Sequence, residues 1–309
     1  MKEKNFITPH FVVIFLAGII LLSGCTSNTK PIHIEKPLFT FAFLTDVHVQ
    51  PERQAMEGFS KAIDMINKLN PDFVLTGGDG IYDALGKTYE RADSLYRIYD
   101  SLQKRFNMPV YNTMGNHEVF GLYEKSGVLP SHPEYGKQMF ENRIGKRYYS
   151  FDRDNWHFMV LDDIGFTDHR TYYGHVDSAH MQWIRNDLEK LDSNINIVIS
   201  AHIPFETVFI NHFLKNEGVS DSIILVTNGG DVLNLFENKN LKLVLQGHTH
   251  VLEDVFIDGI HFVTGGAVSA HWWRGPNFKT EEGFLLVKVY KDTFAYEYID
   301  INWEVKSAE

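Results

Sequence analysis

Five predicted strands end in residue types that bind metal ions. Each strand-like run stops at a short polar segment that carries aspartate, histidine or asparagine. These segments are Asp46-Val47-His48, Gly78-Asp79, Gly115-Asn116-His117-Glu118, Ala201-His202 and Gly247-His248-Thr249-His250. Carboxylate, imidazole and amide oxygen together suit divalent first-row metals and ferric iron, and no thiolate accompanies them. The pattern therefore predicts a metal site where the strands end.

Asp79 is expected at the centre of this site. Residues 73–75 form a short apolar run, and the chain then turns at Gly77 and Gly78 before it reaches Asp79. Glycine permits a tight turn and a close approach of the backbone. Because α/β sheets bind ligands beyond the C-terminal ends of their strands, Asp79 is expected at the mouth of a sheet.

Strand-like and helix-like segments alternate from residue 37 onward. Strands are expected at residues 38–45, 73–75 and 109–113. Helices are expected at residues 52–69 and 89–106, where apolar residues recur at helical spacing. This β-α-β-α-β order predicts a parallel sheet with helices packed on its faces.

The second half of the chain adds strands with fewer helices. Residues 119–145 are interpreted as a loop region, and a hairpin is expected at residues 147–161. A helix is expected to end near Leu191, with Asp177 or Ser178 as its N-cap. Further elements are expected at residues 195–200, 232–236, 241–245, 251–257, 261–264, 284–290 and 294–300, the last four as an antiparallel sheet. The predicted fold class is α/β, with mixed α+β character: two packed sheets with outer helices in one domain, residues 38–303.

In this order the five motifs resemble those of the calcineurin-like metallophosphoesterases, and the resemblance covers nearly all of residues 38–300. It implies a four-layer sandwich of two mixed β-sheets flanked by helices. It also implies two metal ions, which are manganese, iron or zinc. By this resemblance one metal takes Asp46, His48, Asp79 and His250, and the other takes Asp79, Asn116, His202 and His248. Asp79 is the bridge, since one carboxylate can bind two cations.

The family chemistry that the resemblance implies is phosphate ester hydrolysis. Two cations about 3.5–4 Å apart hold a bridging hydroxide, which attacks phosphorus in line. His117 is the candidate general acid, or the donor to a phosphate oxygen, on the leaving-group side, because the pKa of histidine suits proton donation. Either Glu118 or Asp83 is expected to orient its ring.

Tyr82 introduces an alternative. Gly78, Asp79 and Tyr82 also match the Gly-Asp-x-x-Tyr motif of purple acid phosphatases, in which the tyrosine binds ferric iron. That branch usually lacks the histidine of the first motif, whereas this chain has His48. His48 is therefore preferred as the ligand, and Tyr82 is expected to pack behind the ligands.

Residues 267–276 contain the candidates for substrate binding. Arg274 would take a phosphate oxygen bidentately, and Trp272 or Trp273 would stack on a base or sugar ring. The simpler alternative is that the two tryptophans pack in the core and that Arg274 is a surface charge.

The N-terminus has the pattern of a bacterial lipoprotein signal. Lys2 and Lys4 precede a short apolar run at residues 11–22, and Cys25 is the only cysteine. Residues 1–24 are expected to be a signal peptide, and residues 25–37 a lipidated cysteine with a polar tether. The protein is then exported and held on a lipid bilayer, in the outer membrane or on the periplasmic or surface face.

The composition limits the partners. A formal charge of −11 without a basic cluster argues against binding a nucleic-acid polymer. A hydrophobic fraction of 44% suffices for a globular core, and no obligate protein partner is inferred. The leading hypothesis is a hydrolase of small phosphate esters, with monoesters and diesters both open. The alternative is a non-catalytic surface lipoprotein that uses the fold to bind a glycan or a partner.

Overall fold

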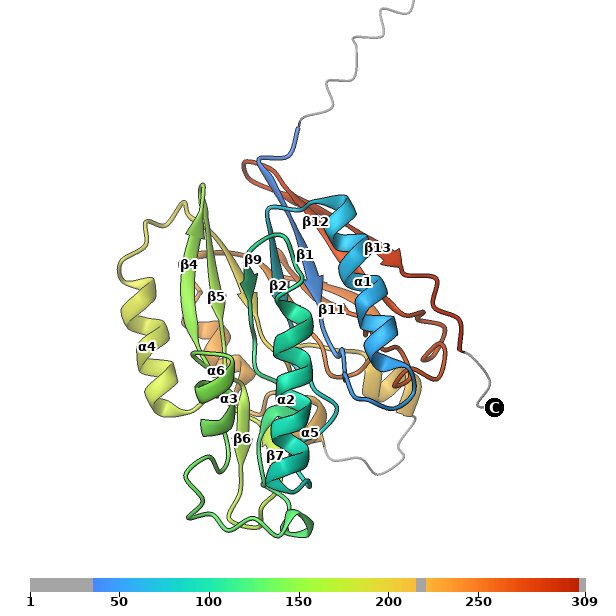
Figure 1. Cartoon of the computed structure of the whole chain (residues 1–309). Helices are drawn as coiled ribbons and strands as arrows, with labels where there is room; N and C mark the ends of the chain where they lie inside the picture. Colours follow the sequence, from blue (N-terminus) through green and yellow to red (C-terminus); the bar gives the residue numbers. More distant parts are fainter. Residues whose placement is uncertain (1–35, 215–220, 306–309) are drawn as a thin grey trace, which may run out of the picture. The chain divides into compact units, whose positions relative to one another are not determined.

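Two large β-sheets form the centre of the computed structural model, which describes residues 36–214 and 221–305 (Figure 1). The first sheet has the order β13-β12-β1-β2-β3 and the second β10-β11-β9-β8-β5-β4. The strands of the first sheet are β1 (Phe39–Leu44), β2 (Phe73–Thr76), β3 (Val110–Tyr111), β12 (Gly283–Val289) and β13 (Phe294–Asp300). Those of the second are β4 (Tyr149–Arg153), β5 (Trp156–Val160), β8 (Asn196–Ser200), β9 (Asn240–Gln246), β10 (Leu252–Ile257) and β11 (Ile260–Gly265).

Helices and a small hairpin complete the described residues. The α-helices are α1 (Ala55–Leu69), α2 (Tyr89–Gln103), α3 (Gln138–Arg143), α4 (Ser178–Leu188), α5 (Asp221–Ile224) and α6 (Gly229–Asn234). Shorter turns are η1 (Asn116–Glu118), η2 (Glu124–Ser126) and the π-helix η3 (Ile210–Leu214). Strands β6 (Ile164–Phe166) and β7 (Tyr172–Gly174) form a separate two-stranded hairpin.

The side chains of β1 alternate between two cores, and this alternation produces four layers. Phe41 and Phe43 belong to the core between the sheets, together with Phe158 of β5. Ala42 and Leu44 point to the opposite face and join the core that contains α1 and α2. Successive strand residues point to opposite faces, so a strand that is buried on both faces must be apolar throughout. Helices α4 and α6 cover the second sheet in the same way.

The predicted fold class is confirmed, but the predicted arrangement of the last four strands is wrong. These strands do not form one antiparallel sheet, because β10 and β11 extend the second sheet while β12 and β13 extend the first. Strand β11 also pairs in parallel with β9. The region predicted as a loop contains η2 and α3, and Asp177 caps α4 by accepting a hydrogen bond from the His180 N–H.

Parallel pairing places the five motifs together. Strands β1, β2 and β3 are parallel, and β8 and β9 are parallel in the other sheet. Their C-terminal ends carry the polar segments of the predicted metal site. In the part of the chain that the structure describes, no helix is long and apolar enough to cross a membrane.

Candidate metal centre

Loops after the strands turn the predicted ligands inward by an unusual backbone conformation. Five of these ligands have a positive φ angle: Asp46 (54°), His48 (47°), Asp79 (53°), His248 (71°) and His250 (58°). Residues other than glycine rarely adopt this left-handed region, and strain of this kind gathers at functional sites. The chain therefore gives up local stability to aim these side chains.

Two motif glycines allow the loops to approach one another. A Cβ atom on Gly115 would lie 2.2 Å from Oδ1 of Asp79, and one on Gly247 would lie 2.6 Å from Oδ2 of Asp46. Any side chain at these positions would displace a carboxylate, so the glycines are required by close contact.

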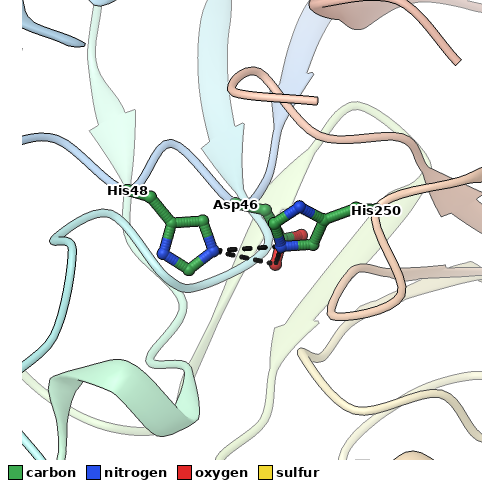
Figure 2. Close-up of side chains that lie close together, drawn as sticks. All are labelled: Asp46, His48 and His250. Carbon is green, nitrogen blue, oxygen red and sulfur yellow. Dashed lines mark hydrogen bonds and ion pairs between the residues drawn. The ribbon is translucent and has the colours of Figure 1, made fainter. Parts of the chain in front are cut away.

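Asp46, His48 and His250 form the first cluster (Figure 2). The Nε2 atoms of the two histidines lie 3.0 Å apart, and Asp46 Oδ1 lies 3.2 Å from His250 Nε2. The other ring nitrogen of His250, Nδ1, donates a hydrogen bond to the Ala270 carbonyl, so Nε2 of the neutral ring carries a lone pair. Among the described residues, Asp46 Oδ1 accepts no hydrogen bond of normal geometry. Acceptor atoms that converge in this way suit a bound cation.

Asn116, His202 and His248 form the second cluster with Asp79. His202 donates from Nδ1 to the Gly77 carbonyl, and its Nε2 lies 2.9 Å from Asn116 Oδ1 and 3.2 Å from His248 Nδ1. Asp79 Oδ2 lies 3.2 Å from the same Nε2 atom. Oxygen and nitrogen acceptors again converge, which is the donor set of a divalent metal.

Each carboxylate uses one oxygen for the protein and leaves the other facing a cluster. Asp46 Oδ2 accepts hydrogen bonds from Thr45 Oγ1 and the His248 N–H. Asp79 Oδ1 accepts from the His117 N–H, whereas Asp79 Oδ2 lies 3.2 Å from His202 Nε2 and 3.7 Å from His48 Nε2. Asp79 therefore faces both clusters with one oxygen.

Electrostatics lead to the same conclusion. Burial lowers the pKa of His48 to about 4 and that of His248 to about 3. Burial opposes the charged form of His202 as well, but the carboxylates around it, led by Asp79, raise its pKa to about 10. Burial would raise the pKa of Asp79, yet neighbouring imidazoles, led by His202, hold it below its usual range. The buried carboxylates thus require neighbouring positive charge, which protonated imidazoles or a metal cation held by the same atoms would supply.

Asp83, rather than Glu118, is placed to orient His117. Asp83 Oδ1 lies 3.7 Å from His117 Nδ1. The Glu118 carboxylate instead accepts backbone hydrogen bonds from Asp79, Ile81 and Gly115. Burial, followed by the Asp79 charge, raises the pKa of Glu118 to about 8. Glu118 therefore fixes the turn that carries Asp79.

Trp272 covers the first cluster. Its half-buried ring stacks on His48 with 4.0 Å between the ring centroids, and it lies 5.3 Å from the ring of His250. Tyr82 meets the edge of Trp272 at 5.6 Å, which agrees with a packing position rather than a metal ligand. Arg274 is exposed, and its substrate role stays a prediction.

Trp273 lies in the core instead of the site. Its side chain is 1% exposed, and its Nε1 donates a hydrogen bond to the Val47 carbonyl. A Cβ atom at Gly58 of α1 would lie 2.1 Å from the ring, so helix and ring fit closely. A ring buried in this way cannot stack on a substrate, and this part of the prediction is corrected.

The hairpin β6–β7 borders the site, and the sequence analysis missed it. Tyr172 of β7 meets the ring of His248 edge-on, with 6.1 Å between the centroids and an angle of 88°. Burial, followed by the nearby Tyr123 and the Asp79 charge, raises the pKa of the Tyr172 hydroxyl. A strand of three residues is too short to show an alternation of apolar and polar residues. Only the adjacent tyrosines at residues 172 and 173 indicated a strand in the sequence.

Solvent reaches the two clusters unequally. The cluster of Asp46, His48 and His250, beneath Trp272, is named the capped subsite. The cluster of Asn116, His202 and His248 is named the open subsite, because His248 is half-buried beside Tyr172. Asp79 is common to both. His117, with a side chain 18% exposed, lies beside the capped subsite: its ring centroid is 4.8 Å from that of His48 and 5.2 Å from that of Trp272, and its Nε2 is 3.9 Å from Asp79 Oδ2.

The comparisons with known proteins agree with this geometry. A sequence model described as calcineurin-like phosphoesterase matches residues 39–252. A manganese-dependent ADP-ribose/CDP-alcohol diphosphatase of Arabidopsis thaliana is 22% identical over 283 residues, covering 73% of this chain and 85% of the relative. Among solved structures, a dimetal phosphatase from Danio rerio has a TM-score of 0.61 at 16% identity and covers 86% of this chain and 97% of its own.

A purple acid phosphatase from yellow lupin has the same fold, with a TM-score of 0.55 at 15% identity, over 88% of this chain and 53% of its own. The similarity to these structures concerns the fold, while the family match extends over most of the chain and includes the metal-binding motifs. The chain belongs to the calcineurin-like phosphoesterase family and is a metal-dependent phosphoesterase.

Proposed function

We propose that the protein is a dinuclear metal hydrolase of small phosphate esters. The observation that carries the proposal is the position of Asp79 Oδ2, which faces His202 in one cluster and His48 in the other. A single carboxylate oxygen facing both clusters favours two cations close together, as in two-metal phosphoesterases. Manganese, iron and zinc all suit these ligands, and the name of the plant relative favours manganese.

The bound cations would supply Lewis acidity at the phosphate oxygens and would lower the pKa of water. The chain's own residues keep the reacting groups in position. Asp79 is held at Oδ1 by the His117 N–H, so the atom that faces both clusters cannot rotate away. Asp46 is held in the same manner by Thr45 and by the His248 N–H. Because the carboxylates are already oriented, they need not reorient during the reaction, and that energetic cost is avoided.

His117 is the residue that would protonate the leaving alcohol. Its ring lies against His48 and beside Trp272, with Nε2 3.9 Å from Asp79 Oδ2, and its side chain is more exposed than that of Asp79. Asp83 Oδ1, 3.7 Å from Nδ1, orients the ring so that Nε2 faces the substrate. A proton from this position makes an alcohol a better leaving group.

The proposal includes both monoesters and diesters, and one relative favours a nucleotide-linked substrate. The plant relative is named as an ADP-ribose/CDP-alcohol diphosphatase. Beside the capped subsite, Trp272 and Tyr82 form an aromatic corner, and the Arg53 guanidinium lies 5.7 Å from the Tyr82 ring centroid. Aromatic and cationic groups side by side suit a base and a second phosphate.

The test is turnover by the full-length chain, purified in detergent and loaded with manganese. The substrates are an aryl phosphate monoester, the matched aryl diester and ADP-ribose. Preference for the diester or for ADP-ribose would identify a phosphodiesterase or diphosphatase, and preference for the monoester a phosphatase. Failure to hydrolyse any of them with manganese bound, or failure to bind manganese, would contradict the proposal.

We also propose that the enzyme is an exported lipoprotein. Residues 1–24 and Cys25 lie outside the described residues, so the sequence pattern alone supports this assignment. Mass spectrometry of the protein from membranes should find cleavage before Cys25 and an acylated cysteine. Cys25→Ser should release the protein from the membrane fraction. An intact N-terminus on the membrane-bound protein would contradict the assignment.

A further inference from the structure

The hairpin β6–β7 is fixed to the open subsite from behind. The Asp163 carbonyl accepts a hydrogen bond from the His175 N–H, just after β7. The carboxylate of Asp163 accepts another from the backbone N–H of His202. One residue therefore connects the base of the hairpin to a predicted metal ligand, and movement of the hairpin relative to this subsite is restricted.

Arg170 fixes the other end of the hairpin. Its guanidinium donates to three backbone carbonyls: Nε to Leu122 at 2.7 Å, and Nη2 to Gly121 at 2.6 Å and to Val128 at 2.9 Å. The residue itself has a φ angle of 58°. A planar guanidinium with three carbonyl acceptors defines both position and orientation, which the single ammonium group of lysine cannot reproduce. The side chain thus joins the hairpin to residues 121–128.

Between these two attachments lies Tyr172, with its ring edge-on to His248. In the part of the chain that the structure describes, its hydroxyl has no protein hydrogen-bond partner. By contrast, the buried Tyr96 donates to the Glu118 carbonyl and Tyr99 bonds to Asn112. A phenol that has no protein partner and lies beside an open metal site is available to a ligand.

We propose that Tyr172 is a substrate-contacting residue, whose hydroxyl donates a hydrogen bond to a non-bridging phosphate oxygen held at the open subsite. Arg170 is a positioning residue that acts through Tyr172. The inference rests on the proposed function and adds to it a phosphate-binding group outside the five motifs. A phenol is a suitable donor because it carries no charge and does not compete with the carboxylates for the metals.

The adjacent Tyr173 provides a matched control. Successive strand residues point to opposite faces, and Tyr173 instead packs near His175 with 5.4 Å between the ring centroids. It lines a surface cavity with Lys137 and Phe166, on the other side of the hairpin from His248. Tyr173→Phe therefore removes the same hydroxyl from the same strand without touching the site.

The experiment compares Tyr172→Phe, Tyr173→Phe and the wild type as full-length, manganese-loaded chains. We measure kcat/KM on the best aryl substrate, calorimetric binding of inorganic phosphate, and metal content. Loss of a hydrogen bond to a charged oxygen is expected to lower kcat/KM by about tenfold to a hundredfold in Tyr172→Phe. Phosphate affinity should fall in parallel, metal content should stay unchanged, and Tyr173→Phe should match the wild type.

Two results would overturn the inference: unchanged phosphate affinity in Tyr172→Phe, or loss of metal from that variant. Phosphate binding is measured even without turnover. If the wild type binds manganese and phosphate but hydrolyses nothing, only the proposed function fails. If the wild type hydrolyses its substrate and Tyr172→Phe is unaffected, only this inference fails. A wild type that neither binds phosphate nor hydrolyses any substrate would overturn both.

A double-mutant cycle tests Arg170. If Arg170 acts through Tyr172, Arg170→Ala should reduce kcat/KM in the wild type but have little further effect in the Tyr172→Phe background. Arg170→Lys should behave like Arg170→Ala, since lysine cannot reach three carbonyls at once. Additive losses would mean that Arg170 supports the fold in general, and would overturn its positioning role.

Discussion

The capped and open subsites use nearly the same ligand types but differ in what surrounds them. The capped subsite is sealed by Trp272, and the neighbouring Trp273 is anchored to the Val47 carbonyl, next to the ligand His48. The open subsite has a half-buried ligand, His248, and a free phenol in Tyr172 beside it. From this difference we infer that metal retention and substrate access are separated under the proposed function: the capped subsite would hold its ion, and the open subsite would receive phosphate.

The largest expected effect comes from Asp79→Asn, because this change affects both subsites at once. Asp79 Oδ2 faces both, and the amide supplies neither the charge nor a bridging carboxylate. Turnover should fall by far more than the ~10–100-fold typical of losing a residue behind a metal ligand. Metal analysis should find both ions depleted.

Single-subsite variants serve as controls for that change. His250→Ala should deplete only the metal of the capped subsite, and His248→Ala only that of the open subsite. If Asp79→Asn loses no more metal than either histidine variant, Asp79 is not shared and the comparison fails.

A smaller effect is expected in the release of metal to a chelator. The metal-loaded protein should lose its ions in two phases, and the slow phase should come from the capped subsite. Aromatic contacts of the kind that Trp272 makes contribute about 0.5–1.5 kcal/mol. Trp272→Ala should therefore accelerate the slow phase by about threefold to tenfold, whereas Trp272→Phe should preserve most of the protection. A single phase in the wild type would show that the cap does not retain metal.

The last effect concerns acid stability behind the open subsite. Burial lowers the pKa of His180 to about 4, and its Nδ1 donates to the Asp162 carbonyl, next to Asp163. The unfolded chain binds this proton near pH 6.5, so between about 6.5 and 4 the unfolded state carries more protons. Stability is therefore retained above about pH 6.5 and lost as the pH falls toward about 4, by up to about 3 kcal/mol.

His180→Phe should remove that part of the pH dependence. The free energy of unfolding is measured by urea titration of the metal-free wild type and variant at several pH values. The titration of the other histidines contributes equally to both proteins and cancels when the two curves are subtracted. Parallel stability curves for variant and wild type would contradict a neutral His180.

The metal-ligand pattern could be predicted from the sequence because each motif follows a strand, and parallel strands bring their C-terminal ends together. The placement of the last four strands could not, since a hairpin pattern does not specify which sheet the hairpin joins. Tyr172 was missed because its position depends on Arg170 and distant carbonyls rather than on spacing. Trp272 and Trp273 are neighbours in different environments. Because both have positive φ angles, neither helical nor strand periodicity could predict which of the two is buried.

The left-handed turns under five of the predicted ligands have a consequence for how the protein evolves. Glycine at those positions would relieve the backbone but remove a ligand, and asparagine would replace a carboxylate or imidazole with a weaker amide ligand. Selection for a more stable chain and selection for a working centre therefore oppose each other at these sites. Ions bound at the proposed centre would offset this cost, because binding to the folded state alone adds stability that rises with the logarithm of the free metal concentration. A metal-starved cell would then lose the protein itself, and not merely its activity.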